Sequence, residues 1–189
     1  MATVESPLTT FADRLAAYDV SLTPVAPTDA QRAIAELLEP PAIGVPLPFE
    51  DVRLPDAVET APTTADLRDA RTGVTPGALG IADYGSVLIE SDQEGTEPIS
   101  LFNERHVVVL RRSDVVPGMP EAFRHLGERA RTNSASAIIA TGPSATADMG
   151  ALVTGAHGPH EVAVVLVDDQ DDATPLEPFT DGSPAGDES

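Results

Sequence analysis

The sequence predicts an α/β fold in which an open sheet is covered by helices. Short apolar runs alternate with segments of helical periodicity in the N-terminal third, the order typical of such a sheet. The middle of the chain holds three apolar runs joined by short links, which adds strands. The 189 residues are 41% hydrophobic, enough for a sizeable core, and this length fits one domain at the usual size of about 100–200 residues.

The first helix is expected where Phe11, Leu15 and Tyr18 recur at helical spacing behind a cap at Thr9 or Thr10. A proline-rich stretch at 46–63 has no periodicity and is expected to be a connection. The other elements expected in this part are a strand at Val20–Val25, a helix opening on the capping box Thr28–Gln31 and stopped by Pro40 and Pro41, a strand at Ala42–Val45, and a short polar helix at Ala65–Ala70.

Three closely spaced apolar runs predict an antiparallel meander in the middle of the chain. They are Ile81–Glu90, Ile99–Phe102 and Val107–Leu110. Glu121–Arg131 is expected to be a helix, because its last turn is rich in arginine, which is favourable at the carbonyl end.

A compact strand–helix–strand unit is expected to follow. Its parts are a strand at Ala137–Ala140, a turn at Thr141–Ser144, a short helix near Ala145–Leu152 and a strand at Val162–Val167. This order predicts a βαβ crossover. Residues 169–189 are acidic and poor in apolar side chains, so we expect an α/β domain over 1–168 and a disordered tail after it.

The chain is strongly acidic, with 31 Asp and Glu residues against 11 basic residues, all arginine, and a net charge of −20. A surface this negative repels phosphate backbones and anionic lipid, so we expect no nucleic-acid partner. Repulsion among the carboxylates destabilises the compact state at low salt. Molar salt shortens the screening length to about 3 Å, so this repulsion largely vanishes. The acidity therefore favours a halophilic protein in a cytosol of very high salt. A low-salt acidic protein is the alternative.

Missing residue types exclude several kinds of chemistry. The absence of cysteine excludes disulfides, a thiolate nucleophile and cysteine ligation of iron–sulfur clusters by this chain, and the absence of lysine excludes Schiff-base catalysis. The longest apolar runs, such as Val162–Val167, are far too short for a membrane span. Met1–Glu5 lacks the features of a signal peptide. We therefore expect a cytoplasmic protein without a membrane span.

The segment Thr141–Asp148 is the first candidate site, because it is expected where a strand passes into a helix. Free N–H groups at a helix start attract a phosphate or carboxylate, and Ser144 or Thr146 could hold it. The alternative is simple helix capping.

The segment Gly155–His160 is the second candidate site. His157 beside two glycines could act as an acid or base near neutral pH, or the segment could be only a tight turn. A metal held by His157 and His160 is not expected, since no third ligand lies nearby in the sequence.

Asp83 and Ser86, within Gly80–Ser86, could face a cleft, with Gly85 marking a bulge in the strand. His106 follows a charged loop and could approach the same cleft. The alternative is that the glycines of this segment only allow the chain to turn into the strand and have no role in a site.

Three segments in order resemble the LUD domain, the lactate utilization protein C family. They are Gly80–Ile89, Thr141–Asp148 and Gly155–Pro159, within a likeness that spans roughly residues 73–168. The resemblance implies a fold similar to the NagB/RpiA/CoA-transferase-like architecture, a mixed sheet between helix layers. It also implies a role in oxidising L-lactate to pyruvate with two partner proteins, one or both carrying iron–sulfur clusters.

The family usually has a basic residue where this chain has Ala145. The candidates to supply that charge are Arg105, Arg111 and Arg112. We expect no cofactor in this chain, iron–sulfur clusters in partner subunits, a small anionic ligand, and compatibility with a homo-oligomer.

The expected site combines proton-handling and ligand-holding groups. The catalytic candidates are His157, His106 and Asp83, and the ligand-binding candidates are Gly85, Ser86, Gly142, Ser144, Thr146, Asp148 and Gly158. The leading hypothesis is a subunit or accessory of an iron–sulfur L-lactate-oxidising system. The alternatives are a stand-alone enzyme or binder of a phosphorylated small molecule or acyl-CoA, and a purely structural scaffold.

Overall fold

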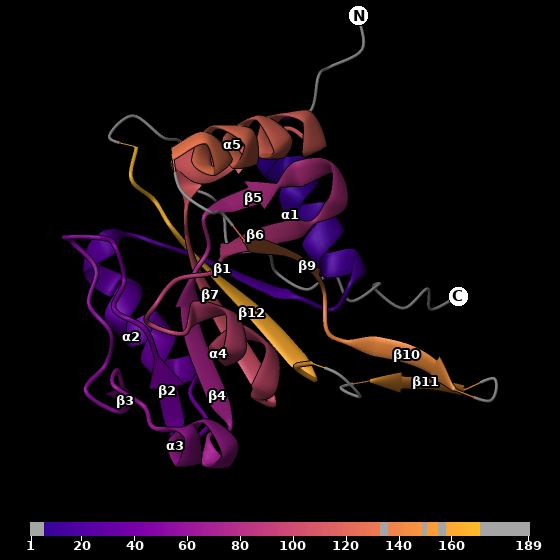
Figure 1. The fold of residues 1–189 in the computed structure, drawn as a ribbon. Helices are drawn as coiled ribbons and strands as arrows, with labels where there is room; N and C mark the ends of the chain where they lie inside the picture. Colours follow the sequence, from indigo (N-terminus) through magenta and orange to yellow (C-terminus); the bar gives the residue numbers. More distant parts are fainter. Residues whose placement is uncertain (1–5, 133–135, 149–150, 155–157, 171–189) are drawn as a thin grey trace, which may run out of the picture.

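A parallel six-stranded sheet forms the centre of the molecule (Figure 1). The computed structural model describes residues 6–132, 136–148, 151–154 and 158–170. In spatial order the strands are β1 (Ser21–Val25), β12 (Glu161–Val167), β7 (Arg105–Arg111), β4 (Thr72–Pro76), β2 (Ala42–Gly44) and β3 (Val58–Glu59). The central strands are buried on both faces, which explains their near-continuous runs of valine and leucine.

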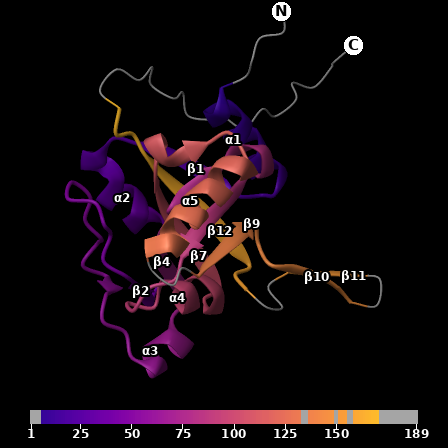
Figure 2. The ribbon, with the colours of Figure 1, turned by 45° about the horizontal axis from the view of Figure 1, so that its top comes forward.

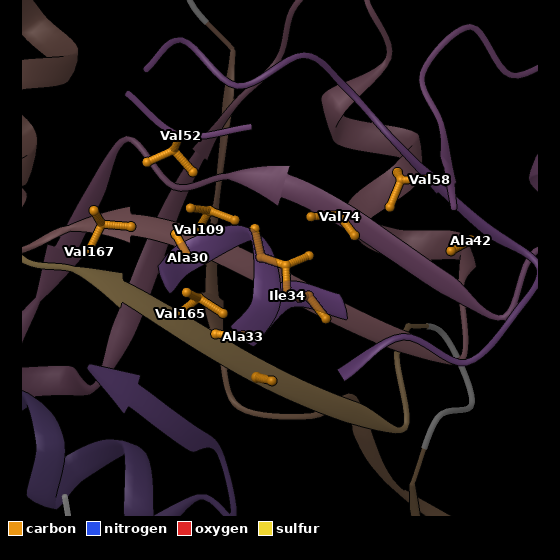
Figure 3. Close-up of a cluster of buried hydrophobic side chains, with 12 residues drawn as sticks. Ala30, Ala33, Ile34, Ala42, Val52, Val58, Val74, Val109, Val165 and Val167 are labelled. Carbon is orange, nitrogen blue, oxygen red and sulfur yellow. The ribbon is translucent and has the colours of Figure 1, made fainter. Parts of the chain in front are cut away.

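One face of this sheet is covered by α2 (Pro27–Leu37), as Figures 1 and 2 show. Ala30, Ala33 and Ile34 of the helix pack on valines of β4, β7 and β12 (Figure 3). The helix begins at Pro27, just before the expected capping box, because proline already has a helical φ and needs no N–H partner at that position. It ends before Pro40, as the sequence predicts.

The other face is covered by α1 (Pro7–Ala17) and by a second sheet. Ser6 caps α1, accepting a hydrogen bond from the Thr9 N–H at 3.2 Å, so the cap lies upstream of the expected threonines. Phe11 and Leu15 are fully buried against the sheet, as their spacing predicts.

The second sheet is mixed. Its strands in spatial order are β8 (Val115–Val116), β5 (Leu79–Ile81), β6 (Ser86–Glu90) and β9 (Ala137–Thr141). The helix α5 (Met119–Thr132) packs on its outer face, where Ala122 meets Leu79, Ile81 and Leu88. The sheet is thus held between α5 and the main sheet.

Short elements complete the described chain. They are α3 (Thr64–Asp69), α4 (Thr96–Phe102), the 3-10 turns η1 (Ala82–Tyr84) and η2 (Arg112–Asp114), and the hairpin strands β10 (Ala145–Asp148) and β11 (Ala151–Thr154). Thr63 and Asp66 form a reciprocal capping box that starts α3 close to its expected position.

The expected antiparallel meander is wrong. Ile99–Phe102 lies in α4, which starts after Gly95 with the Thr96 N–H bonded to the Asp92 carboxylate at 2.9 Å. Val107–Leu110 lies in β7 and pairs in parallel with β4 and β12. Neighbouring apolar runs were expected to pair with each other, whereas the actual partners come from distant parts of the chain.

The expected βαβ crossover is also wrong. The two strands β9 and β12 belong to different sheets, and Ala145–Asp148 is a strand where a helix was expected. The fold class itself is confirmed: the molecule is an α/β protein in which a parallel sheet is flanked by helices.

Candidate functional site

Two segments singled out in the sequence meet at the amino end of β12. The Ser144 N–H donates a hydrogen bond to the Pro159 carbonyl oxygen at 2.9 Å. A Cβ added to Gly158 would lie 2.9 Å from the Ser144 Cβ, closer than real Cβ atoms approach, so only glycine fits here. We call residues 141–144 and 158–161 the motif junction. It makes one structural unit of two segments that are separated in the sequence.

The motif junction is tied to the second sheet and to α1. The Ser86 and Thr141 hydroxyl oxygens are 2.6 Å apart, at paired positions of β6 and β9. Gly85 and Gly142 both have positive φ, and an added Cβ would press on Arg14 of α1 at Gly85 and on Tyr18, just after α1, at Gly142. Gly85, Ser86, Gly142, Ser144 and Gly158 therefore form a connected structural cluster.

The helix start expected at this turn is absent. Thr146 and Asp148 lie in β10, paired with Val153 and Ala151. A strand has no set of free N–H groups aligned at its start, so the argument for an anion held by a helix terminus does not apply here. His157 lies outside the described residues. The ligand-binding and catalytic roles of all these residues remain predictions.

Asp83 and His106 lie in different surroundings. Asp83 is exposed in η1, its N–H donates to the Pro117 carbonyl at 3.1 Å, and its carboxylate contacts Gly118. His106 is buried in β7, with its Nε2 2.8 Å from the Thr75 hydroxyl. Burial lowers the pKa of His106 to about 4, so its ring is neutral at pH 7.

Side chains alternate between the two faces of a strand, and this alternation places Ser86 and His106 in different layers. Ser86 shares a face with Leu88, which packs in the cluster that includes Ala122 of α5. His106 shares a face of β7 with Val108, which packs on the opposite side of β6. The Ser86 and His106 side chains therefore lie towards opposite sides of β6, and the cleft expected to bring them together with Asp83 stays a prediction.

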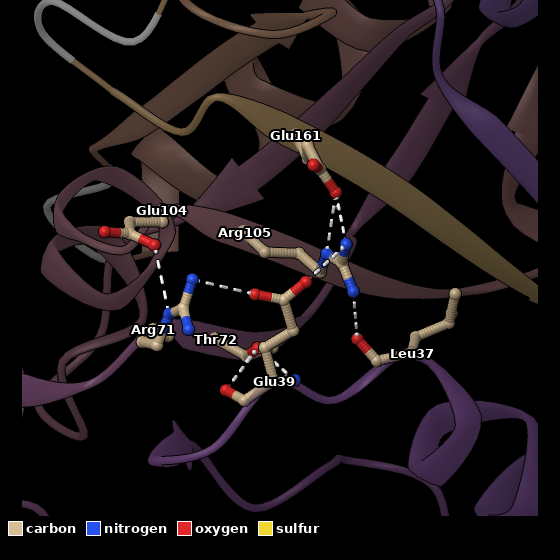
Figure 4. Close-up of polar contacts among 7 residues, drawn as sticks. All are labelled: Leu37, Glu39, Arg71, Thr72, Glu104, Arg105 and Glu161. Carbon is tan, nitrogen blue, oxygen red and sulfur yellow. Dashed lines mark hydrogen bonds and ion pairs between the residues drawn. The ribbon is translucent and has the colours of Figure 1, made fainter.

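A network of ion pairs lies at the amino edge of the main sheet (Figure 4). Arg105 bonds the carboxylates of Glu161 and Glu39, and its Nη1 donates to the Leu37 carbonyl at 2.9 Å. Arg71 pairs with Glu39 at 3.2 Å and with Glu104 at 3.2 Å. These contacts join the end of α2 to the first residues of β4, β7 and β12.

The sequence reasoning missed this network, apart from noting a charged loop before His106. Its members come from four distant segments, and no local spacing connects them. The network borders a cavity of about 330 Å³, lined also by His160 of the motif junction.

A larger cavity, of about 360 Å³, opens where the carboxyl ends of β2, β4 and β6 converge. Open α/β sheets usually bind ligands at this edge. The residues lining it are Pro46, Pro48, Pro76, Gly77, Ala78, Glu90, Ser91, Asp92, Glu94, Thr96 and Arg129. None of these is a residue predicted from the sequence.

The charges around this cavity disfavour an anion. Three carboxylates line it against one guanidinium, and Arg129 bonds both oxygens of Glu90, at 3.1 and 2.6 Å. The cavity at the amino edge also has more carboxylates than arginines around it. A small carboxylate ligand would therefore meet net repulsion in both cavities.

Within the described ranges, no group of three or more His, Asp or Glu side chains is placed to hold a metal ion. Over the same residues, every helix is too short or too polar to cross a bilayer.

Comparison with known families gives a match to the LUD domain over residues 23–167. The chain belongs to the LUD domain family. This span covers nearly all of the main sheet, α2, the second sheet with α5, and the motif junction, and it leaves out α1.

This LUD domain is similar to named bacterial proteins. It is 29% identical over 119 residues to lactate utilization protein C of Bacillus velezensis, covering 61% of this chain and 49% of the relative. It is 30% identical over 109 residues to lactate utilization protein C of Bacillus subtilis, covering 53% of this chain and 44% of that relative. It is 29% identical over 118 residues to the uncharacterized protein YkgG of Escherichia coli, covering 60% of this chain and 51% of that relative. The chain thus spans about half the length of these relatives.

A solved structure shares the fold. The crystal structure of a DUF162 family protein from Deinococcus radiodurans superposes with a TM-score of 0.66 at 22% identity, over 85% of this chain and 96% of that chain.

The three arginines considered as substitutes for a basic group at Ala145 are all engaged in this LUD domain. Arg105 belongs to the amino-edge network, and Arg112 pairs with Asp168 at 3.0 Å. Arg111 pairs with Asp51 and stacks over Phe49, with its guanidinium carbon 4.7 Å from the ring centre. The hydrogen bond to Arg111 lowers the pKa of Asp51, as expected for a carboxylate held by a guanidinium.

We expect Arg105→Ala to destabilise the domain by about 1–3 kcal/mol, because it removes charge-assisted bonds from a guanidinium that is mostly shielded from water. The variant leaves Glu39 and Glu161 without this partner and Leu37 without its donor. Urea unfolding measures the change. Arg32→Ala is the control with the same change of charge, since Arg32 forms an exposed pair within α2 and should cost only about 0.3 kcal/mol. Equal losses would contradict a structural role for the network.

Proposed function

We propose that this LUD domain serves L-lactate utilisation, as a subunit or accessory of an iron–sulfur system that oxidises L-lactate to pyruvate. Family membership, together with relatives that carry the name lactate utilization protein C, is the observation that supports the proposal. The motif junction adds support, since the two segments that carry the resemblance form one unit with a glycine that cannot be replaced without a clash.

The chemistry favours a partner. Conversion of lactate to pyruvate releases two electrons and two protons, and some group must accept the electrons. This chain has no cysteine to ligate an iron–sulfur cluster through thiolates. The excess of carboxylates around both cavities also argues against this chain alone holding the lactate anion. We therefore place the redox centres, and the main binding of lactate, in partner proteins.

Within such a system the motif junction is the proposed point of contact with the reacting ligand. Ser144 would offer a hydroxyl group, Ser86 would support the junction from below through its hydrogen bond to Thr141, and Gly158 would allow close backbone approach. The proton-handling role proposed for His157, His106 and Asp83 rests on the sequence. For His106, the lowered pKa makes a positioning role through Thr75 more suitable than proton uptake near pH 7.

Deletion of the gene tests the proposal. We expect a deletion strain to grow slowly on L-lactate and normally on pyruvate, because pyruvate lies beyond the oxidation step. The tagged full chain, expressed in the deletion strain, should restore growth on lactate and co-purify with a cysteine-rich iron–sulfur protein. Normal growth of the deletion strain on lactate would refute the proposal.

We also propose that the protein works in a cytosol of high salt, with an α/β domain over 1–168 and an acidic tail over 169–189. The net charge of −20 supports this, because salt screens the self-repulsion of the folded chain. The melting midpoint is expected to rise between dilute buffer and molar KCl. A melting midpoint that does not change with KCl would contradict the proposal that the protein is adapted to high salt.

A further inference from the structure

The hairpin β10–β11 stands apart from both larger sheets. Figures 1 and 2 show it extending away from the body, beside the amino end of β12. Its strands pair from Ala145 opposite Thr154 to Asp148 opposite Ala151. Among the described residues no third strand joins it. A two-stranded hairpin alone is marginally stable in water, so pairing of one of its free edges with a further strand would stabilise it.

The hairpin belongs to the least charged part of the chain. Between Arg131 and Glu161 the only Asp, Glu, Lys or Arg residue is Asp148, although 22% of the whole chain is charged. The strand β11 contains neither a charged residue nor a proline. These are the residues that normally protect a free strand edge from pairing. By contrast β1, at the edge of the main sheet, contains Pro24.

We propose that β11 pairs antiparallel with β11 of a second copy of this chain, so that two hairpins form a four-stranded sheet across a two-fold axis. An antiparallel pair of identical strands is two-fold symmetric by itself and therefore needs no second complementary surface. Four strands also remove the marginal stability of the isolated hairpin.

The low charge of this segment favours contact between two copies at the hairpin. Two chains that each carry a net charge of −20 repel each other. The hairpin extends away from the body, as Figures 1 and 2 show, and its two strands carry a single carboxylate, that of Asp148. Contact there keeps the acidic bodies apart, and the remaining repulsion is screened at molar salt. The dimer is therefore tighter in molar KCl than in dilute buffer.

Single-cysteine variants test the pairing directly, because the chain has no cysteine of its own. Leu152→Cys and Val153→Cys, alone and mixed, are oxidised in molar KCl. Directly opposed residues of an antiparallel pair have Cα atoms about 4.5–5.5 Å apart, which lies within disulfide range. We expect a covalent dimer from Leu152→Cys, Val153→Cys or their mixture. Arg32→Cys, on the exposed side of α2, is the control and should give no disulfide-linked dimer.

Light scattering on the uncross-linked chain gives the second measurement. Val153→Asp places like charges at the proposed contact, and Val153→Asn is the matched neutral control. We expect the aspartate variant to dimerise up to about fivefold more weakly than the asparagine variant, since like charges across a strand pair cost up to about 1 kcal/mol. A monomeric wild-type chain in molar KCl overturns the proposal. A dimer that gives no disulfide at Leu152 or Val153 and is equally stable in both Val153 variants overturns it as well.

Discussion

Replacing Gly73 with alanine is expected to cost the domain about 1–3 kcal/mol or more of its free energy of unfolding, the range for overpacked cores. Gly73 lies in β4 beneath α4. A Cβ there would be 2.5 Å from the Asn103 side-chain oxygen and 2.5 Å from the Ile99 carbonyl oxygen. The Ile99 oxygen belongs to the backbone of α4 and cannot rotate away, so the whole helix would have to shift. Urea unfolding in molar KCl measures the loss.

Asn103 makes this site still less tolerant. Its side-chain Nδ2 donates to the Ala70 carbonyl at 3.1 Å, while its Oδ1 is buried and has no hydrogen-bond partner within the described structure. Displacing Asn103 would therefore break a buried bond as well as the packing of α4.

Gly127→Ala is the matched control for the first prediction. Gly127 lies within α5, where an added Cβ meets nothing within 4 Å. Alanine is a better helix former than glycine by about 1 kcal/mol, so this variant should unfold at higher urea concentration than the wild type. A Gly73→Ala variant as stable as the wild type would show that α4 does not pack on β4 as described.

Acid is expected to destabilise the domain through His106. Burial lowers the pKa of the His106 ring to about 4, from the ordinary value of 6.5 for histidine. Below pH 6.5 the unfolded chain binds a proton that the folded chain refuses, so stability falls as the pH falls from 6.5 towards 4. At 1.36 kcal/mol per pKa unit the loss attributable to His106 approaches about 3 kcal/mol.

His106→Gln isolates this effect, because glutamine can still bond Thr75 but does not titrate. The free energy of unfolding of both proteins is measured at several pH values between 7 and 4.5. The carboxylates contribute equally to both proteins, so the difference between the two curves reports His106 alone. We expect wild-type stability to fall more steeply than that of the variant. Parallel curves for wild type and His106→Gln would show that His106 titrates freely.

Local sequence patterns were sufficient for several elements. The helices α1, α2, α3 and α5 follow from apolar spacing, capping residues and the arginine-rich last turn of α5, all of which act within one or two helical turns. The strands β7 and β12 were located from their apolar runs. The motif segments Thr141–Ser144 and Gly158–Pro159 were singled out from the sequence, and the structure joins them through the Ser144 N–H and the Pro159 carbonyl oxygen.

The same patterns failed where the decisive partner is distant. Ile99–Phe102 is apolar enough for a strand, yet Asp92 and Gly95 start a helix there. Ala145–Asp148 contains residues that suit a helix start, yet it pairs with Ala151–Thr154 as a strand. Short segments of this kind have weak intrinsic preferences, so pairing and packing decide their conformation.

The sequence alone was enough for properties that depend on composition or on neighbouring residues: the net charge of −20, the absence of cysteine and lysine, the main helices and the identity of the motif segments. The tertiary structure decided which strands pair, that His106 is buried beside Thr75, and that Gly73 and Gly158 have no room for a side chain. These features arise from contacts between residues far apart in the chain. No local spacing encodes such contacts, because they exist only once the sheets and helices have packed together.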